Sequence, residues 1–170
     1  MVILFSERKS SAQKDIIEIL TSVGADYISD KEVNASNGLF TIVSEYKKTN
    51  LKLKNGIAVI CDNTDRFNGQ KLPKGIIGVC EDTNTNALEL FKSNGTPVIS
   101  CGMGNKNTIT LSSLGNKALL ISLQRIITDI SGDDIEPIDI KISVKKSYST
   151  FSIMASAAVL LLKGIIPKQF

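Results

Sequence analysis

Three cysteines occupy matching places in the sequence and are the first candidates for chemistry. Cys61, Cys80 and Cys101 each stand at or just beyond the end of a short apolar run. If these runs are neighbouring parallel strands, the thiols lie along the edge of the sheet where open α/β folds bind ligands. Adjacent thiolates could hold a soft metal or carry redox chemistry. Because no Cys-x-x-Cys pair and no histidine accompanies them, packing at crowded strand ends is the simpler interpretation.

Acidic residues follow two of the same apolar runs. Asp62 and Asp65 come after the first run, and Glu81 and Asp82 come after the second. Paired carboxylates at a strand end could bind Mg²⁺ or accept hydrogen bonds from a sugar hydroxyl. Aspartate is equally common in turns and at helix starts, which favours a structural role. Asp62, Glu81 and Asp82 remain candidate ligand-binding residues.

The third apolar run leads into the stretch CGMGNKNT at residues 101–108, which adds Cys101, Gly102, Gly104 and Lys106 to the candidates. A phosphate-binding loop needs a glycine directly before its lysine and a helix after it. Here Asn105 precedes the lysine, and the following residues have the pattern of a strand. A phosphate loop is therefore not expected in this stretch.

The composition excludes several classes of function. The 170 residues contain no histidine, which removes histidine-based triads and histidine-ligated metal sites. A total of 20 basic and 17 acidic residues leaves a net charge of only +3. The lysine cluster formed by Lys47, Lys48, Lys52 and Lys54 has no arginine fork beside it and is interpreted as a solvated edge. We therefore expect no metal, no cofactor and no nucleic-acid partner.

The apolar segments are too short for targeting or for membrane insertion. The run Met1–Phe5 is shorter than the roughly 7 to 15 residues of a signal-peptide core. The run Ile153–Leu162 is well below the roughly 20 residues that span a bilayer. An odd number of cysteines also suits reduced thiols. The sequence predicts one cytoplasmic domain without a membrane partner.

The pattern of apolar residues predicts the fold class. Apolar runs without polar alternation, such as Ile57–Ile60 and Ile76–Val79, are typical of parallel strands that are covered on both faces. We expect a single α/β domain at 1–170: a three-layer, mostly parallel Rossmann-like sheet with an antiparallel β-hairpin extension and a buried C-terminal helix. Its predicted parts are a strand-helix-strand start at 1–55, a parallel βαβ part at 56–103, antiparallel hairpins at 104–147 and the C-terminal helix at 148–170.

Capping residues predict two of the helices. Ser10, with Gln13 three residues later, has the spacing of a capping box, and Gly24 supplies the residue that ends this helix. Thr85 can cap a second helix that ends at Gly95. The second helix lies between two of the expected parallel strands and completes a βαβ unit.

The remaining third of the chain combines turn signals with a very apolar helix. Gly115-Asn116 and Gly132-Asp133 separate the extended segments Thr108–Leu111, Ala118–Ile130 and Ile135–Val144, which predicts hairpins. The last helix, Thr150–Lys163, is apolar on nearly every side. Such a helix must be buried, and a second copy of the chain could complete its burial.

Three segments resemble the central domain of the Mur ligase family, the ATP-dependent amide-forming enzymes of cell-wall precursor synthesis. In GIIGVCEDTNTNALELFKSNGTPVISCGM, Gly75–Met103, a strand ending in an Asn/Asp-rich turn leads through a helix to a strand that ends in glycine. In STFSIMASAAVLLLKGIIPKQF, Ser149–Phe170, an alanine-rich helix is followed by Gly-Ile. The β-rich stretch around Ile135–Val144 lies between them as in the family. The likeness covers roughly residues 56–170.

The resemblance implies the fold but not the activity of these ligases. The family's ATP-binding loop with its Gly-Lys-Thr, its metal-binding Glu and His, and its His-Asn pair before the last helix have no counterparts here. Tyr148 and Ser149 stand where that pair would fall. Glu81, Asp82 and Gly102 are retained. A chain of 170 residues is also too short to include the family's separate amino-acid-binding domain.

Three functional hypotheses follow. The first is a stand-alone Mur-ligase-like domain that serves as a non-catalytic binding or assembly module, with a homo-oligomer formed through the C-terminal helix. The second is an enzyme that binds a small molecule or a nucleotide at the acidic, cysteine-bearing rim. The third is binding of a nucleotide or sugar nucleotide without turnover.

Overall fold

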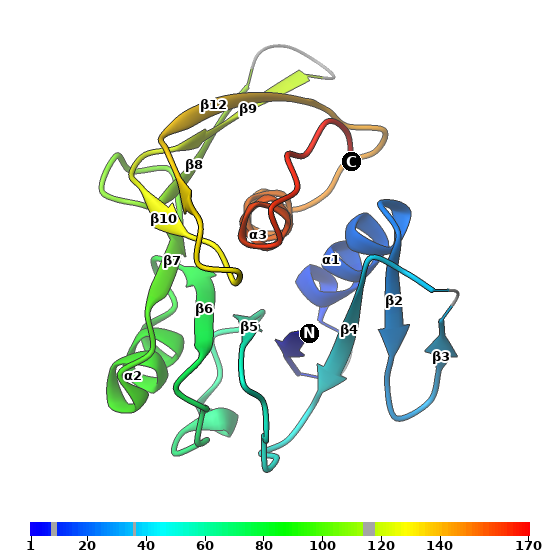
Figure 1. The fold of residues 1–170 in the computed structure, drawn as a ribbon, viewed down its shortest axis with the longest axis vertical. Helices are drawn as coiled ribbons and strands as arrows, with labels where there is room; N and C mark the ends of the chain where they lie inside the picture. The colour runs from blue at the N-terminus through cyan, green and yellow to red at the C-terminus, as the bar shows by residue number, and fades with distance from the viewer. Residues whose placement is uncertain (8–9, 36, 114–117) are drawn as a thin grey trace.

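One large curved sheet forms the framework of the domain (Figure 1). A computed structural model describes residues 1–7, 10–35, 37–113 and 118–170. Within these residues the sheet strands are β1 Val2–Phe5, β2 Ala25–Ile28, β3 Val33–Asn34, β4 Phe40–Glu45, β5 Gly56–Ile60, β6 Ile76–Glu81, β7 Val98–Cys101, β8 Ile109–Ser113, β9 Ala118–Leu123 and β12 Ile138–Ser143. They form a ten-stranded sheet in the order β12-β9-β8-β7-β6-β5-β1-β4-β2-β3. A separate two-stranded sheet pairs β10 Ile127–Thr128 with β11 Asp134–Ile135.

The centre of the sheet is parallel, as predicted. Strands β5, β6 and β7 lie side by side and run in the same direction, with Ile57 opposite Ile77 and Val79 opposite Ile99. Strand β1 inserts between β5 and β4, and both of these pairings are parallel. The strands are rich in Ile and Val because both faces are covered. The carboxyl ends of these strands therefore meet at one edge of the sheet.

Helix α1 (Ser11–Ser22) begins at the predicted Ser10 cap, but only half of the predicted capping box forms, because the Ser10 amide donates to the Glu7 oxygen and not to the Gln13 side chain. The Ser10 hydroxyl accepts a hydrogen bond from the Gln13 amide at 3.2 Å and caps the helix. Ile16 and Ile19 are fully buried against the sheet. Gly24 takes φ +97, a conformation that favours glycine, and turns the chain into β2.

Helix α2 (Thr85–Asn94) begins with a different cap from the one that the sequence indicated. The cap is Asn84, whose side chain accepts from the Ala87 amide at 2.9 Å, and Thr85 is the first helical residue. Asn and Thr both satisfy the free amides of a first turn, so composition alone did not separate the two positions. The helix ends at Gly95 in the left-handed conformation, as expected.

Helix α3 (Thr150–Leu162) is buried by this chain itself. Every residue from Phe151 to Leu162 is at most 8% exposed. The helix packs against α1, and the antiparallel strands β8, β9 and β12 curve around it (Figure 1). Its burial thus needs no second copy. No helix in the described residues is long and apolar enough to cross a membrane.

The antiparallel extension is more broken than the sequence suggested. Strands β8, β9 and β12 form the expected antiparallel ladder at the edge of the sheet. The predicted single segment Ala118–Ile130 instead stops at Leu123 and resumes as the short strand β10. The predicted segment Ile135–Val144 divides around Pro137, which lacks the amide that a strand ladder requires. The turn expected at Gly115-Asn116 lies outside the described residues.

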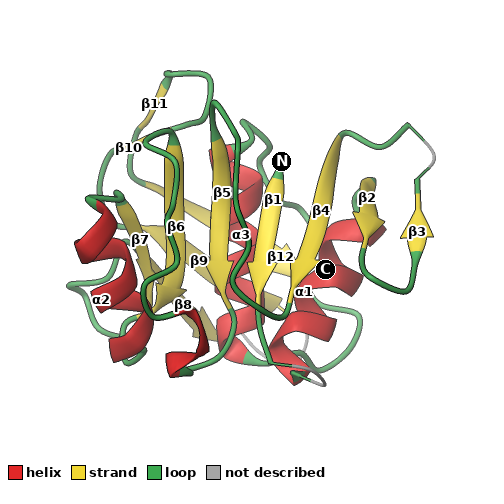
Figure 2. Ribbon diagram, turned by 90° about the horizontal axis from the view of Figure 1, so that it is seen from below, coloured by secondary structure: helices red, strands yellow, loops and turns green. Residues whose placement is uncertain are grey.

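The domain has three layers. Helices α1 and α3 cover one face of the sheet, whereas α2 and the short 3₁₀ helix η1 (Asp65–Phe67) lie on the other (Figure 2). The connection between β4 and β5 contains no helix. Consequently Ile28 and Val43, on strands β2 and β4, are only half-buried.

Candidate functional site

The three cysteines do not converge on one site. Cys61 and Cys101 belong to the core on the α3 side of the sheet, whereas Cys80 belongs to the core on the α2 side. All three are free thiols and buried. Burial raises the pKa of Cys61 and of Cys101 well above the ordinary value, and it raises the pKa of Cys80 to about 12. The described residues contain no group of three or more metal-binding side chains.

We expect the three thiols of the folded protein to react very slowly with a thiol reagent at pH 8. A rise of the Cys80 pKa to about 12 lowers its thiolate fraction by roughly 10³-fold relative to an exposed cysteine. Titration with a chromogenic disulfide, with and without guanidinium, measures this. The denatured chain should react fully, and fast reaction of the native protein would contradict the structure.

Asp62 lies at the sheet edge, but its carboxylate accepts hydrogen bonds from other residues of the chain. One oxygen accepts from the Glu7 amide at 2.8 Å, and the other accepts from the Ser10 hydroxyl at 2.7 Å. The backbone oxygen of Asp62 accepts from the Asn84 side chain at 3.1 Å. Asp62 thereby connects the starts of α1 and α2.

The other candidates on the rim also hold turns in place. Asp82 accepts from the Asn107 side chain at 2.7 Å, and both groups pack closely over Gly102, which has no side chain to obstruct them. Glu81, Gly104 and Lys106 are exposed. The structure thus brings Asp82 and Gly102 together and leaves Glu81 and Lys106 at the surface. Asn84 and Asn107, which the sequence analysis did not select, join these turns.

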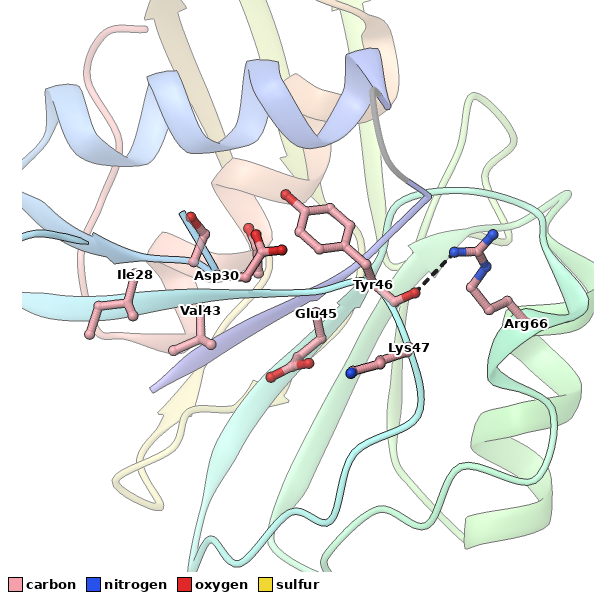
Figure 3. Close-up of a pocket in the computed structure, with 9 residues that line it drawn as sticks. Ile28, Asp30, Val43, Glu45, Tyr46, Lys47 and Arg66 are labelled. Atoms are coloured by element: carbon pink, nitrogen blue, oxygen red, sulfur yellow. Dashed lines mark hydrogen bonds between the residues drawn. The ribbon is translucent and has the colours of Figure 1, made fainter. Parts of the chain in front are cut away.

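A pocket of about 490 Å³ opens on another part of the same edge (Figure 3). It lies at the carboxyl ends of β2 and β4, and η1 contributes one side chain. Its volume falls within the range of roughly 300 to 1,000 Å³ that is usual for small-molecule sites. The lining residues are Ile28, Ser29, Asp30, Val43, Ser44, Glu45, Tyr46, Lys47 and Arg66.

The pocket contains charges of both signs. Asp30 and Glu45 contribute carboxylates, and Lys47 and Arg66 contribute cations. Partial burial raises the pKa of Glu45; Lys47 opposes this shift and Asp30 adds to it, so these three groups interact. Arg66 donates to the backbone oxygen of Tyr46 at 3.1 Å, as Figure 3 shows. This bond keeps the guanidinium beside the pocket.

A buried polar network supports the pocket from the α1 side. The Gln13 side chain donates to the Ser44 hydroxyl at 3.0 Å, and that hydroxyl donates to the Tyr27 hydroxyl at 3.1 Å. Burial raises the pKa of Tyr46, and neighbouring Tyr27 acts in the same direction. Tyr46 is therefore a neutral phenol at physiological pH and can donate or accept a hydrogen bond.

The sequence analysis did not find this pocket, although one signal was present. Glu45 is the last residue of β4 and is followed by Tyr46 and Lys47, just as acidic residues stand at or shortly after the ends of β5 and β6. We interpreted the lysines beyond them as a solvated edge, and nothing local indicated that Arg66, about twenty residues later, would face them.

Comparison with solved structures finds this fold in two ligases. MurF from Acinetobacter baumannii matches 97% of this chain with a TM-score of 0.57 and 9% sequence identity, and the match spans 42% of that protein. The UDP-N-acetylmuramate:L-alanyl-gamma-D-glutamyl-meso-diaminopimelate ligase of Neisseria meningitides matches 99% with a TM-score of 0.59 and 8% identity, and the match spans 62% of its length. No protein-family model and no curated protein matches the sequence.

These similarities establish a Mur-ligase-like α/β fold for the chain. They extend over nearly all of it and so include residues 1–55, where the sequence alone suggested no resemblance. The chain spans less than two thirds of either ligase. At such low sequence identity, the similarity to these two ligases shows only a shared fold.

Proposed function

We propose that this domain is a non-catalytic binding module whose pocket at the ends of β2 and β4 holds a small polar molecule that carries both charges. The observation that carries the proposal is the lining of the pocket. Asp30 and Glu45 suit an ammonium group, and Lys47 and Arg66 suit a carboxylate or phosphate. The half-buried Ile28 on the pocket wall offers apolar contact between them.

Short peptides are the first ligands to test. The name of the Neisseria ligase includes L-alanyl-gamma-D-glutamyl-meso-diaminopimelate, a tripeptide with both ammonium and carboxylate groups. A pocket of about 490 Å³ has room for a molecule of this size. The alternative of an enzyme that works through the cysteine-bearing rim has less support, because its thiols are buried and protonated.

Replacing Arg66 with alanine is expected to weaken binding of such a peptide about tenfold or more. The side chain is exposed and makes one hydrogen bond to a backbone oxygen, so the fold should tolerate its loss. A charge-assisted bond to a carboxylate contributes roughly 1.5–3 kcal/mol, which corresponds to at least tenfold in affinity. Isothermal titration calorimetry with the tripeptide measures the change.

Arg125→Ala is the matched control. Arg125 is also exposed and donates to a backbone oxygen, that of Lys106, but it lies outside the pocket. Its replacement should leave affinity unchanged. The proposal fails if the wild-type protein binds neither the tripeptide nor smaller zwitterions, or if both variants lose affinity equally.

Two expectations remain proposals. The first is a homo-oligomer: because α3 is buried within the chain, a second copy would have to use another surface. The second is a cytoplasmic location, which agrees with three free cysteines. Sedimentation over a range of concentrations tests the first of these.

A further inference from the structure

Strand β12 is an open edge of the ten-stranded sheet. On one side it pairs with β9 along its full length, from Ile138 to Ser143. On its other side, the described residues supply a partner only at its last residue. The Ser143 amide donates to the Lys168 oxygen at 3.3 Å, and the Ser143 oxygen accepts from the Phe170 amide at 2.8 Å. The remainder of this edge therefore presents backbone groups that another strand can pair with.

The direction of the Ser143 groups shows which residues form the free edge. In an antiparallel ladder the backbone groups of successive residues point alternately toward and away from the neighbouring strand. Because those of Ser143 point away from β9, those of Lys141 and Asp139 do so as well. Both residues are exposed and form no hydrogen bond or ion pair with the described part of the chain, apart from their place in the β12 strand. Pro137, two residues earlier, has no amide to donate and ends the free edge.

The two charges on this edge are spaced so that they complement a second copy of the same strand. When two copies of β12 lie antiparallel with Ile140 opposite Ile140, Asp139 of each copy lies opposite Lys141 of the other. Opposite charges directly across a strand pair stabilise it, and like charges destabilise it. The registers shifted by two residues to either side place Asp139 opposite Asp139, or Lys141 opposite Lys141. The charges therefore favour one register over its neighbours.

We propose that β12 is a dimer interface, at which it pairs antiparallel with the β12 strand of a second copy in this register. In each Asp139–Lys141 pair, the outward backbone groups of the two residues exchange two hydrogen bonds. Ile138, which is 39% exposed in the single chain, comes to lie opposite Ile142 of the other copy and gains an apolar neighbour. The interface supplies a surface for the homo-oligomer proposed above, and it does not depend on the ligand pocket.

The opposite edge of the sheet is less suited to this kind of pairing. It is formed by β3, which has only two residues, Val33 and Asn34. Neither residue is charged, so the side chains of β3 do not select a register. Of the two edges, β12 alone combines free backbone groups with charges that complement their own copy.

Reversal of the charges on β12 tests the proposal. The wild-type chain should show a monomer–dimer equilibrium in sedimentation experiments at concentrations up to millimolar. Asp139→Lys and Lys141→Asp each place like charges opposite one another in both pairs, so the dissociation constant of the dimer should rise about tenfold or more. The variant that carries both substitutions restores opposite charges in both pairs and should dimerise as the wild-type protein does. Both positions are exposed, so the fold should tolerate the changes.

Glu89→Lys is the matched control, because it changes the net charge as Asp139→Lys does but lies exposed on α2. It should leave dimerisation unchanged. In the wild-type protein, amide exchange at Asp139 and Lys141 should slow as the protein concentration rises. The proposal is overturned if the wild-type chain stays monomeric at millimolar concentration, or if the doubly substituted variant does not recover the dimer. A dimer that persists in both single variants would use another surface and would equally overturn this interface, whereas loss of peptide binding at the pocket would not affect it.

Discussion

Replacing Leu160 with alanine is expected to lower the free energy of unfolding by about 2–5 kcal/mol, the range for removing a large aliphatic side chain from a packed core. Leu160 is 0% exposed and lies in the core between α3 and the sheet. That core also contains side chains from α1 and from the curved strands β8, β9 and β12, so a cavity at this point weakens contacts across much of the domain. Urea unfolding of the two proteins measures the difference.

Leu88→Ala is the matched control for this experiment. Leu88 is also a helical leucine, but it is 36% exposed on α2, so its replacement should cost well under half as much. Both variants should retain the wild-type sedimentation behaviour, because α3 is covered by its own chain. A change in oligomeric state caused only by Leu160→Ala would show that α3 contacts a second copy.

The central fold could be predicted because its signals are local. The uninterrupted apolar residues of Ile57–Ile60 and Ile76–Val79 indicate strands that are buried on both faces, and such strands are parallel. Gly24 and Gly95 ended their helices as predicted. The same reasoning identified the last helix from its lack of a polar face. In each case a few adjacent residues carried the information.

The candidate site could be predicted only in part because its contacts are distant in sequence. The predicted edge exists, and Asp62, Glu81 and Asp82 lie along it. The partners of Asp62 are about fifty residues away, so the sequence did not reveal that its carboxylate is already bound. The pocket requires β4 to lie between β1 and β2, an order that no periodicity encodes.

The edge of the sheet therefore divides into two structurally different parts. At β5, β6 and β7 the acidic side chains bind amides and hydroxyls of the chain itself, as Asp62 and Asp82 do. At the carboxyl ends of β2 and β4, where the connection from β4 to β5 contains no helix, a pocket with charged walls opens.

Gly75→Ala is expected to destabilise the protein by about 1–3 kcal/mol, the usual cost of forcing an extra methyl group into a filled space. A Cβ at this position would overlap the carbonyl oxygen of Lys54. That oxygen cannot move freely, because Gly56 donates to the Gly75 oxygen at 3.1 Å and Ile57 donates to the Met1 oxygen at 3.1 Å. The substitution must therefore displace the beginning of β5. Urea unfolding and amide exchange at Gly56 and Ile57 measure the effect.

Gly104→Ala separates this effect from the general consequences of replacing glycine. An added Cβ at Gly104 would lie 3.8 Å from its nearest neighbour, the Asn107 side chain, which is an ordinary contact. Its backbone is not in the left-handed region, so alanine should be tolerated with little change in stability. The connection between β4 and β5 begins at Tyr46 and Lys47 in the pocket and ends at Asn55, which lies beside Gly75. Faster exchange at Gly56 in Gly75→Ala, with none in Gly104→Ala, is the expected result. Equal stability of the two variants would mean that the β5 start yields without cost, and that the pocket segment is not anchored at its far end.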